Sequence, residues 1–226
     1  MDNQTIIKFF IFPVLAYLLG SIPFGLLIGK ARGLDVRTAG SGNIGATNVG
    51  RLLGRRWGYI CFLLDVAKGL IPVVLINLYL RRCGSLAADA GLPPTAQWAL
   101  LAAGAAAILG HMFSLYLRFH GGKGVATSLG VVLAVFPYFT LTAPLALCVW
   151  AAVWGWWRYV SLASITAALA FPAGFTLLIW RIDNWHFDSL WPLFSFSCLM
   201  AALVILRHRA NIIRLLAGTE NQPSKS

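Results

Sequence analysis

The chain has 226 residues, of which 59% are hydrophobic and only 11% are charged, and its mean hydropathy is +0.76. A soluble domain is nearer half apolar and a quarter charged, and a soluble fold of this length has too little interior for so many apolar side chains. Composition therefore excludes a soluble enzyme, a disordered chain and a secreted disulfide-rich module. It indicates an all-α, polytopic integral membrane protein with one membrane-embedded domain over residues 1–226.

Seven apolar runs lie along the chain, and a helix needs about 20 such residues to cross a bilayer. They are residues 6–29, 57–80, 96–117, 125–141, 143–157, 160–180 and 189–206. The first run is longer than the apolar core of a signal peptide and follows no basic segment, so we interpret it as a span. The fourth and fifth runs are short and are separated only by a turn expected at Thr140 to Pro144. We expect about seven transmembrane helices, although five or six also fit the pattern.

The net charge of +11 comes from 18 Lys and Arg residues against 7 Asp and Glu residues. In a soluble protein this balance would first indicate nucleic acid, but in a membrane protein it is typical of cytoplasmic loops. Thirteen of the 18 cations fall on alternate loops and the tail, and hence on one side. This pattern predicts an N-terminus outside, a C-terminus in the cytoplasm and no nucleic-acid partner. The four cysteines form no C-x-x-C pair, so no disulfide or zinc framework is indicated.

Glycines in the first predicted cytoplasmic segment, residues 39–58, alternate with hydroxyl, amide and guanidinium side chains. These side chains belong to Ser41, Asn43, Thr47, Asn48 and Arg51. Glycine lets a backbone approach a ligand closely, successive exposed N–H groups bind anions, and arginine offers a planar fork to phosphate. The alternative is a flexible linker, but a linker does not need this density of donors, so we expect a ligand site.

A second glycine-rich segment lies between the third and fourth runs. Its central residues are Gly121, Gly122, Lys123 and Gly124. The P-loop pattern G-x-x-x-x-G-K-[ST] does not fit, which excludes a P-loop nucleotide hydrolase. We expect free backbone N–H groups and the positive end of a helix dipole here. With the Lys123 charge and the Thr127 hydroxyl they would form a phosphate cradle, the alternative being a tight turn with a snorkelling lysine.

Asp65, Lys68 and His111 are ionisable residues within predicted spans. We expect Asp65 and Lys68, three residues apart, to pair, because isolated ions in lipid are costly. His111, near the inner end of the third run, is either a helix-packing hydrogen bonder or a catalytic base.

The C-terminal segment forms a third cluster. His208, Asn211 and Arg214 recur every three residues and so lie near one helical face, and Glu220 follows a helix-breaking Gly218. The alternative is the ordinary basic end of a last span. All three clusters fall on the predicted cytoplasmic side, which suits a substrate that carries one or two phosphate groups.

The motifs GSGNIGATNVGR, GHMFSLYLRFHGGKGVAT and HRANIIRLLAGTE, in this order, resemble those of the bacterial acyl-phosphate:glycerol-3-phosphate acyltransferases, the PlsY family. The resemblance covers nearly the whole chain. It implies transfer of a fatty acyl group from acyl phosphate to position 1 of glycerol 3-phosphate, which gives lysophosphatidic acid and phosphate in the first committed step of bacterial phospholipid synthesis. It also implies a multi-pass inner-membrane enzyme with its active site facing the cytoplasm, no direct use of acyl-CoA or acyl carrier protein, and no metal or cofactor.

Carried over onto this sequence, the resemblance implies catalytic roles for Ser41, Arg51 and His111. It implies substrate or phosphate binding by Asn43, Thr47, Asn48, Gly121, Gly122, Lys123, Gly124, Thr127, His208, Asn211 and Glu220. Other glycerophosphate acyltransferases use H-x-x-x-x-D, but no histidine of this chain is followed by aspartate at that spacing, so the general base stays open. A transporter for an organic phosphate and a lipid-binding scaffold are the competing classes.

Overall fold

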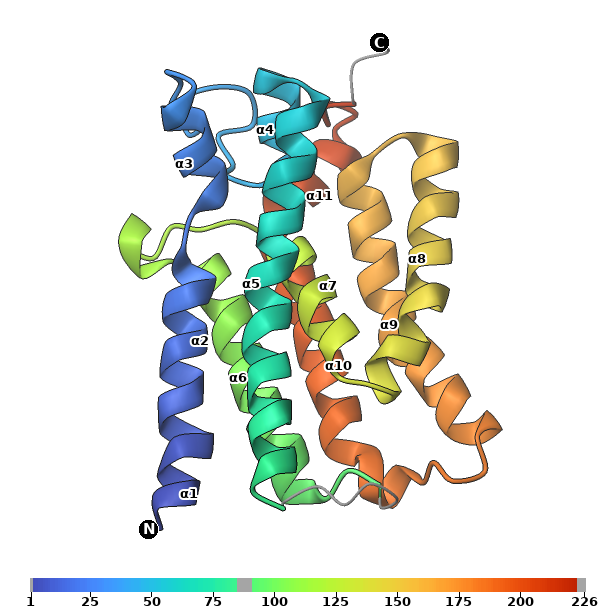
Figure 1. Ribbon diagram of the computed structural model, residues 1–226. Helices are drawn as coiled ribbons and strands as arrows, with labels where there is room; N and C mark the ends of the chain where they lie inside the picture. The colour runs from blue at the N-terminus through green and yellow to red at the C-terminus, as the bar shows by residue number, and fades with distance from the viewer. Residues whose placement is uncertain (1, 85–90, 223–226) are drawn as a thin grey trace.

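Long apolar runs become helices in a bilayer because lipid offers no water to satisfy backbone N–H and C=O groups. The computed structural model describes residues 2–84 and 91–222, and the regular secondary structure of those residues is helical, with no β-strand among them (Figure 1). The first membrane segment consists of α1 (Asn3–Ile6), a π-helical turn η1 (Ile7–Ile11), α2 (Phe12–Ser21) and α3 (Phe24–Ala31). The following elements are α4 (Ala46–Leu53), α5 (Arg55–Arg82), α6 (Pro94–Met112), η2 (Leu115–Leu117), α7 (Val125–Ala134), α8 (Tyr138–Trp157), α9 (Val160–Arg181), α10 (Phe187–Arg207) and α11 (Arg209–Leu216).

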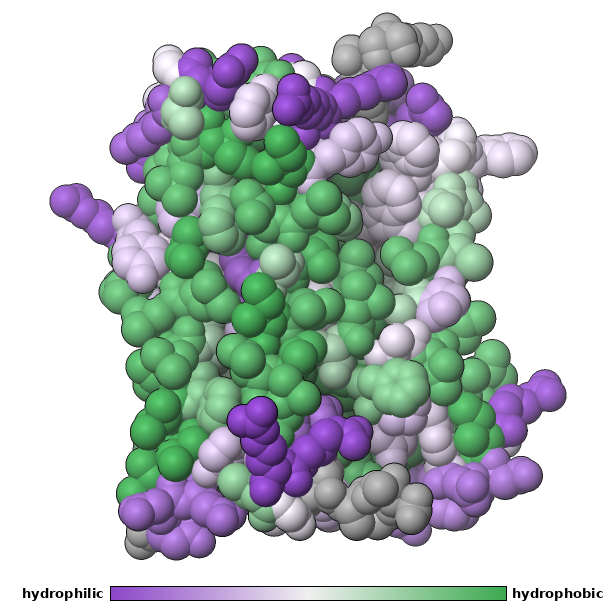
Figure 2. Space-filling model, viewed as in Figure 1, coloured by the Kyte–Doolittle hydropathy of each residue, from purple (hydrophilic) through white to green (hydrophobic). Residues whose placement is uncertain are grey.

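Six helical segments in the described part of the chain are long and apolar enough to cross a membrane. They are Asn3–Ala31, Arg55–Arg82, Pro94–Leu117, Tyr138–Trp157, Val160–Arg181 and Phe187–Arg207. On the face shown in Figure 2, apolar residues form a band across the middle of the molecule and hydrophilic residues gather at its two ends, as a membrane protein requires. The expectation of a polytopic all-helical membrane protein is confirmed.

The fourth expected span, residues 125–141, is a shorter helix than the sequence predicted, α7. The turn lies at residues 135–137 rather than at Thr140 to Pro144, and α8 runs through both of those residues. Pro137 has no N–H and cannot extend α7, whereas a proline inside a membrane helix, such as Pro144, is tolerated. The 10 residues of α7 are about 15 Å long at 1.5 Å per residue, half of a hydrocarbon core of about 30 Å. Because α7 still reverses the chain, α1 and α11 lie at opposite ends of the bundle (Figure 1).

Close backbone contact holds the short helix α7 against α5. A Cβ added at Gly69 of α5 would lie 2.1 Å from the Thr127 carbonyl oxygen, and one added at Gly130 of α7 would lie 2.0 Å from the Val66 carbonyl oxygen. Small residues allow membrane helices to approach in this way. The two glycines therefore fix the depth and direction of α7 along a full-length helix.

The first membrane segment breaks between α2 and α3, at Ile22 and Pro23. The break frees two backbone carbonyls, and buried side chains satisfy both. The Ser114 hydroxyl donates to the Ser21 carbonyl at 2.5 Å, and the Lys68 ammonium donates to the Ile22 carbonyl at 2.9 Å. Lys68 also pairs with Asp65 at 2.8 Å, which confirms the expected pair.

Removing the Lys68 charge should leave the buried Asp65 carboxylate without its partner and the Ile22 carbonyl without its donor. We expect Lys68→Met to lower the free energy of unfolding by about 3–5 kcal/mol, the usual cost of breaking a buried ion pair. The measurement is the melting temperature in detergent. The double variant Lys68→Met/Asp65→Asn should lose less than Lys68→Met alone, and a single variant that melts like the wild type would contradict this role.

Candidate active site

A cavity of about 760 Å³ brings together all three polar segments and a deeper apolar part lined by α7, α8, α9 and α10. Eleven of the fourteen expected site residues line it. They are Ser41, Asn43, Thr47, Asn48, Arg51, His111, Lys123, Gly124, His208, Asn211 and Glu220. Gly121, Gly122 and Thr127 lie behind its wall. The cavity is thus amphiphilic, with a polar end near α4 and α11 and an apolar end deep in the bundle.

The first segment is organised around the buried side chain of Asn48. Its Nδ2 donates to the carbonyls of Val36 and Asn43, both at 2.9 Å, and its Oδ1 accepts from the Ser41 N–H at 2.9 Å. A Cβ at Gly40, where φ is +62°, would lie 2.3 Å from that Oδ1. Among the residues that the structure describes, the Asn48 amide therefore bonds only to the backbone of this loop. Its contribution to the site is to fix the position of Ser41.

Three side chains of this segment are left without protein partners. Within the described residues, the Ser41 hydroxyl, the Thr47 hydroxyl and the Arg51 guanidinium line the cavity and bond to no other protein group. They present two neutral donors and one cationic fork to whatever fills the polar end.

The glycines of the second segment differ from the expected cradle of free N–H groups. The Gly121 N–H donates to the Met112 carbonyl at 3.1 Å and the Gly122 N–H to the His111 carbonyl at 3.0 Å, so both are satisfied by the end of α6. Thr127 also departs from expectation, because it is fully buried against α5. The cradle is therefore smaller than predicted. Contacts with α6 use the two N–H groups, packing against α5 buries Thr127, and neither contact can be deduced from the local sequence. Lys123, Gly124 and the first turn of α7 remain in the cavity wall.

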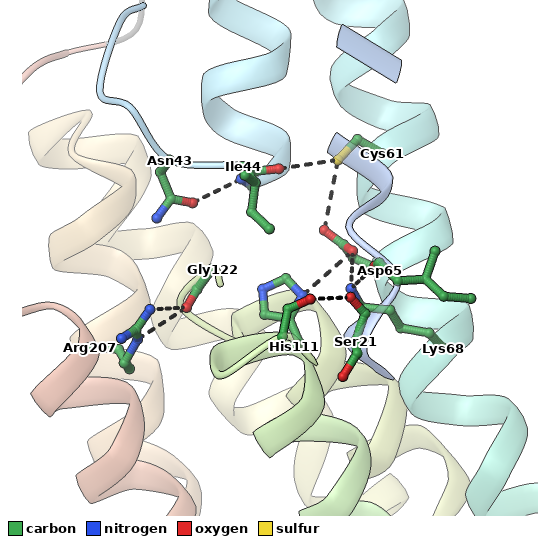
Figure 3. Close-up of polar contacts among 12 residues, drawn as sticks. Ser21, Asn43, Ile44, Cys61, Asp65, Lys68, His111, Gly122 and Arg207 are labelled. Atoms are coloured by element: carbon green, nitrogen blue, oxygen red, sulfur yellow. Dashed lines mark hydrogen bonds and ion pairs between the residues drawn. The ribbon is translucent and has the colours of Figure 1, made fainter. Parts of the chain in front are cut away.

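Arg207, at the end of α10, holds the same two glycines from the other side (Figure 3). Its guanidinium donates to the Gly121 carbonyl at 2.8 Å and to the Gly122 carbonyl at 2.9 and 3.1 Å. The segment that leads into Lys123 is therefore fixed between α6 and α10. This role of Arg207 was not predicted, because the sequence shows only an arginine at the end of an apolar run.

His111 lines the cavity and packs against the second of these glycines. A Cβ at Gly122 would lie 2.2 Å from His111 Nε2, so that nitrogen faces the glycine backbone. Nδ1 lies 3.6 Å from the Asp65 carboxylate, which is too long for a hydrogen bond, and Figure 3 shows the ring between these two neighbours. Asp65, which also lines the cavity, is a second site residue that the sequence did not reveal. This geometry favours a positioning role for His111.

Lys123 stands where the positive charges of the polar end converge. The pKa of its ammonium is lowered to about 8, mainly by burial and also by the nearby charges of Arg214, Arg51 and Arg207, while the Glu220 carboxylate acts in the opposite direction. Several cations thus surround one carboxylate. Such an excess of positive charge in a partly enclosed site attracts an anion with more than one negative charge.

The Glu220 carboxylate joins the tail to two helices. It accepts from the Ser161 hydroxyl at 2.8 Å, from Asn211 Nδ2 at 2.6 Å and from Arg214 Nε at 2.8 Å. Burial raises the pKa of this carboxyl, but the three hydrogen bonds outweigh burial and leave the pKa below its ordinary value. Protein donors therefore surround the Glu220 carboxylate, which holds Asn211 and Arg214 in the cavity wall.

His208 and Asn211 offer acceptors to the cavity. His208 Nδ1 lies 2.7 Å from the Val204 carbonyl, so that nitrogen carries the proton and Nε2 keeps its lone pair. Burial lowers the pKa of His208 to about 4, and the ring is neutral at pH 7. Asn211 Oδ1 is buried and has no hydrogen-bond partner in the described part of the chain. Both atoms suit the hydroxyl groups of a polar substrate.

Fold and site together define the class: an integral membrane protein whose cationic pocket continues into an apolar cavity, as an enzyme that joins a phosphorylated alcohol to a fatty chain requires. A sequence model of the family described as glycerol-3-phosphate acyltransferase matches residues 10–218. The chain belongs to this family, as the three motifs predicted.

Known members of the family are similar along almost their whole length. The glycerol-3-phosphate acyltransferase of Geotalea daltonii is 50% identical over 206 residues, which is 91% of this chain and 93% of that protein. That of Aquifex aeolicus is 43% identical over 209 residues, or 92% and 96% of the two chains. Crystal structures of PlsY (YgiH), an integral membrane glycerol 3-phosphate acyltransferase, in its glycerol 3-phosphate and lysophosphatidic acid forms give TM-scores of 0.76 and 0.74. Both are 41% identical and cover 95% of this chain and 94% of theirs.

The contact between Gly122 and His111 generates a test. Gly122→Ala should displace the imidazole or the glycine segment and so misplace Lys123, and we expect a rise of about tenfold or more in KM for glycerol 3-phosphate. In a His111→Ala background the new methyl group has room, so the same substitution should cost much less, as coupled neighbours do. Equal losses in the two backgrounds would mean that the added Cβ acts on something other than His111.

Proposed function

We propose that this protein transfers a fatty acyl group from acyl phosphate to position 1 of glycerol 3-phosphate and releases lysophosphatidic acid and inorganic phosphate. The observation that carries the proposal is the single cavity with a cationic end and an apolar end. The polar end has enough cations for two phosphate groups, and the apolar part suits a fatty chain. PlsY, the solved relative, has been crystallised with glycerol 3-phosphate and with lysophosphatidic acid, one substrate and one product of this reaction.

An acyl phosphate as donor matches the chemistry of the side chains. A mixed anhydride carries a good leaving group, so the enzyme needs to align two anions and stabilise the developing oxyanion. Ser41 and Arg51 have free donors for the donor phosphate and the oxyanion. Lys123 and the N-terminus of α7 supply positive charge for the phosphate of glycerol 3-phosphate. The donor is used directly, without acyl-CoA or acyl carrier protein, and the reaction needs neither metal nor cofactor.

The remaining residues of the site position these groups. His208 Nε2 and Asn211 Oδ1 accept from the glycerol hydroxyls and orient the attacking oxygen. Asn48 and Glu220 act through the loop and tail that they hold together. His111 fixes the glycine segment, so no protein side chain serves as an obligatory base.

The substrate itself takes the proton in this mechanism. The hydroxyl oxygen at position 1 attacks the acyl carbonyl carbon, and the bond from that carbon to the phosphate oxygen of the donor breaks. The hydroxyl proton passes to the phosphate of glycerol 3-phosphate, whose second pKa of about 6 is that of a phosphate monoester. General acid–base help is worth about 10²–10⁴-fold, so His111→Ala should lose less than that range.

The cation distribution sets the orientation that we propose. The end of the bundle that carries α4 and α11 faces the cytoplasm, and the N-terminus lies outside, in the inner membrane of a bacterium. There the reaction would form the first committed intermediate of phospholipid synthesis. A transporter would need a path through the bundle, whereas the apolar end of this cavity is enclosed by Phe139 and Phe196.

The proposed function is tested by the identity of the acyl donor. Purified protein in detergent should convert glycerol 3-phosphate to lysophosphatidic acid with palmitoyl phosphate and without added palmitoyl-CoA or palmitoyl acyl carrier protein. Ser41→Ala should retain the fold, shown by an unchanged melting temperature, and lose most of the activity. Product formed from palmitoyl-CoA alone would overturn the donor, and an acyl group trapped on Ser41 from radiolabelled palmitoyl phosphate would overturn the direct transfer.

The pKa of Lys123 predicts a pH dependence. As pH rises through about 8, the free enzyme loses this positive charge while the substrate phosphate keeps its full negative charge. KM for glycerol 3-phosphate should therefore rise several-fold between pH 7.5 and pH 9.5. Lys123→Arg keeps its charge and should show a flatter profile from a weaker starting affinity. A wild-type KM that stays constant over this interval would exclude Lys123 as the phosphate anchor.

A further inference from the structure

The apolar part of the cavity follows one face of α8. The residues that line it along this helix are Phe139, Ala143, Ala146, Leu147, Trp150 and Trp154. Apart from Leu147, which follows Ala146 directly, they are three or four residues apart and lie on a single stripe. The fifteen residue steps from first to last rise about 22 Å at 1.5 Å per residue. The cavity is therefore long and narrow, with the site at one end of the stripe and Phe139 at the other.

The two ends of this stripe differ in exposure. The lining residue Tyr59 of α5, near the polar end, is 67% exposed, and Leu147, midway along the stripe on α8, is 46% exposed. The exposure of these apolar lining side chains indicates that the cavity opens sideways toward lipid. Farther from the site, the lining residues Ala143, Phe139 and Phe196 are only 3%, 1% and 8% exposed. A chain that enters from the side therefore ends in an enclosed space.

Packed aromatic rings form the floor of that space. The Phe139 ring lies 5.2 Å from the Phe171 ring and 6.2 Å from the Phe196 ring, and all three side chains line the cavity. A second layer supports them, since Phe175 lies 5.4 Å from Phe139 and 5.9 Å from Trp185. Aromatic pairs at these separations attract each other beyond their buried area. The floor is thus a packed wall, with no flexible aliphatic end that would yield to a longer chain.

The depth of the cavity matches the length of a membrane lipid chain. Along α10 the lining runs from His208 at the polar end to Phe196 at the floor, twelve residues or about 18 Å of helix. One leaflet of a bilayer has about 15 Å of hydrocarbon, half of the usual core thickness. A chain of lipid length, held at the site by its carbonyl carbon, therefore reaches the aromatic floor.

We propose that Phe139, Phe171 and Phe196 limit the length of the acyl chain that this enzyme transfers. The inference rests on the proposed function, because it takes the fatty chain of the donor as the occupant of the apolar part. Chains that stop short of the floor leave apolar surface unfilled, and longer chains meet the rings. A single methylene in such a pocket changes kcat/KM by about tenfold or more, so the floor produces a sharp upper limit.

The test is a competition among acyl phosphates from dodecanoyl to eicosanoyl, with the lysophosphatidic acid products resolved by mass. Phe139→Ala should shift the preferred donor by about two carbons or more toward longer chains. Ala143→Leu, one turn nearer the site, should shift the preference toward shorter chains. The matched control is Phe187→Ala, which removes a ring from the aromatic pair with Phe194 outside the cavity lining and should leave the preference unchanged.

A binding measurement tests the aromatic floor independently of acyl transfer. Lysophosphatidic acids of the same chain lengths should raise the melting temperature of the protein up to a limiting length, and Phe139→Ala should move that limit upward. Preferences and limits that are the same in wild type, Phe139→Ala and Ala143→Leu would overturn the proposal. A wild type that uses no acyl phosphate but shows the length limit in melting would instead overturn the donor and support the floor.

Discussion

The arginine fork on two glycine carbonyls is the contact on which the site depends. Arg207 and the end of α6 hold Gly121 and Gly122 from opposite sides, and α7 begins two residues after Lys123. The lysine is thereby placed where the polar and apolar parts of the cavity meet. A helix half as long as its neighbours then leaves the space beneath that lysine open to side chains of α8, α9 and α10.

Buried polar contacts elsewhere in the bundle serve the same arrangement. The break between α2 and α3 exposes carbonyls that lipid cannot satisfy, and Lys68 and Ser114 satisfy them from two other spans. Asp65 pairs with Lys68 on one side and approaches His111 on the other. One connected set of contacts therefore runs from the broken first segment to the glycines that carry Lys123.

The sequence predicted most of the fold because hydropathy reports directly on membrane helices. It located every long span and the pairing of Asp65 with Lys68, but it misplaced the end of α7. The sequence has a proline at each of two possible positions for that turn. Tertiary packing determines that the chain turns at Pro137 and that α8 continues through Pro144. Hydropathy also does not show how far a helix extends across the bilayer. The short helix α7 and the apolar turn after it therefore form one apolar run that was interpreted as a span.

In the site, the sequence predicted the side-chain donors but not the state of the backbone N–H groups, for a physical reason. Residue type and spacing revealed the donors that remain free, such as Ser41, Arg51 and Lys123. They did not reveal which backbone N–H groups are already bonded, so Gly121 and Gly122 were taken for ligand donors. Arg207 and Asp65 sit within or at the end of apolar runs, and their importance arises from what they contact across the bundle.

The sideways opening beside Tyr59 and Leu147 gives the proposed reaction two separate reservoirs. In that reaction glycerol 3-phosphate would reach the polar end from water, where its supply is a volume concentration. The acyl donor would arrive within the plane of the leaflet, where its supply is a mole fraction of the surrounding lipid. Inert lipid would therefore dilute one substrate and not the other, and the finished product would slide back into the leaflet without exposing its chain to water.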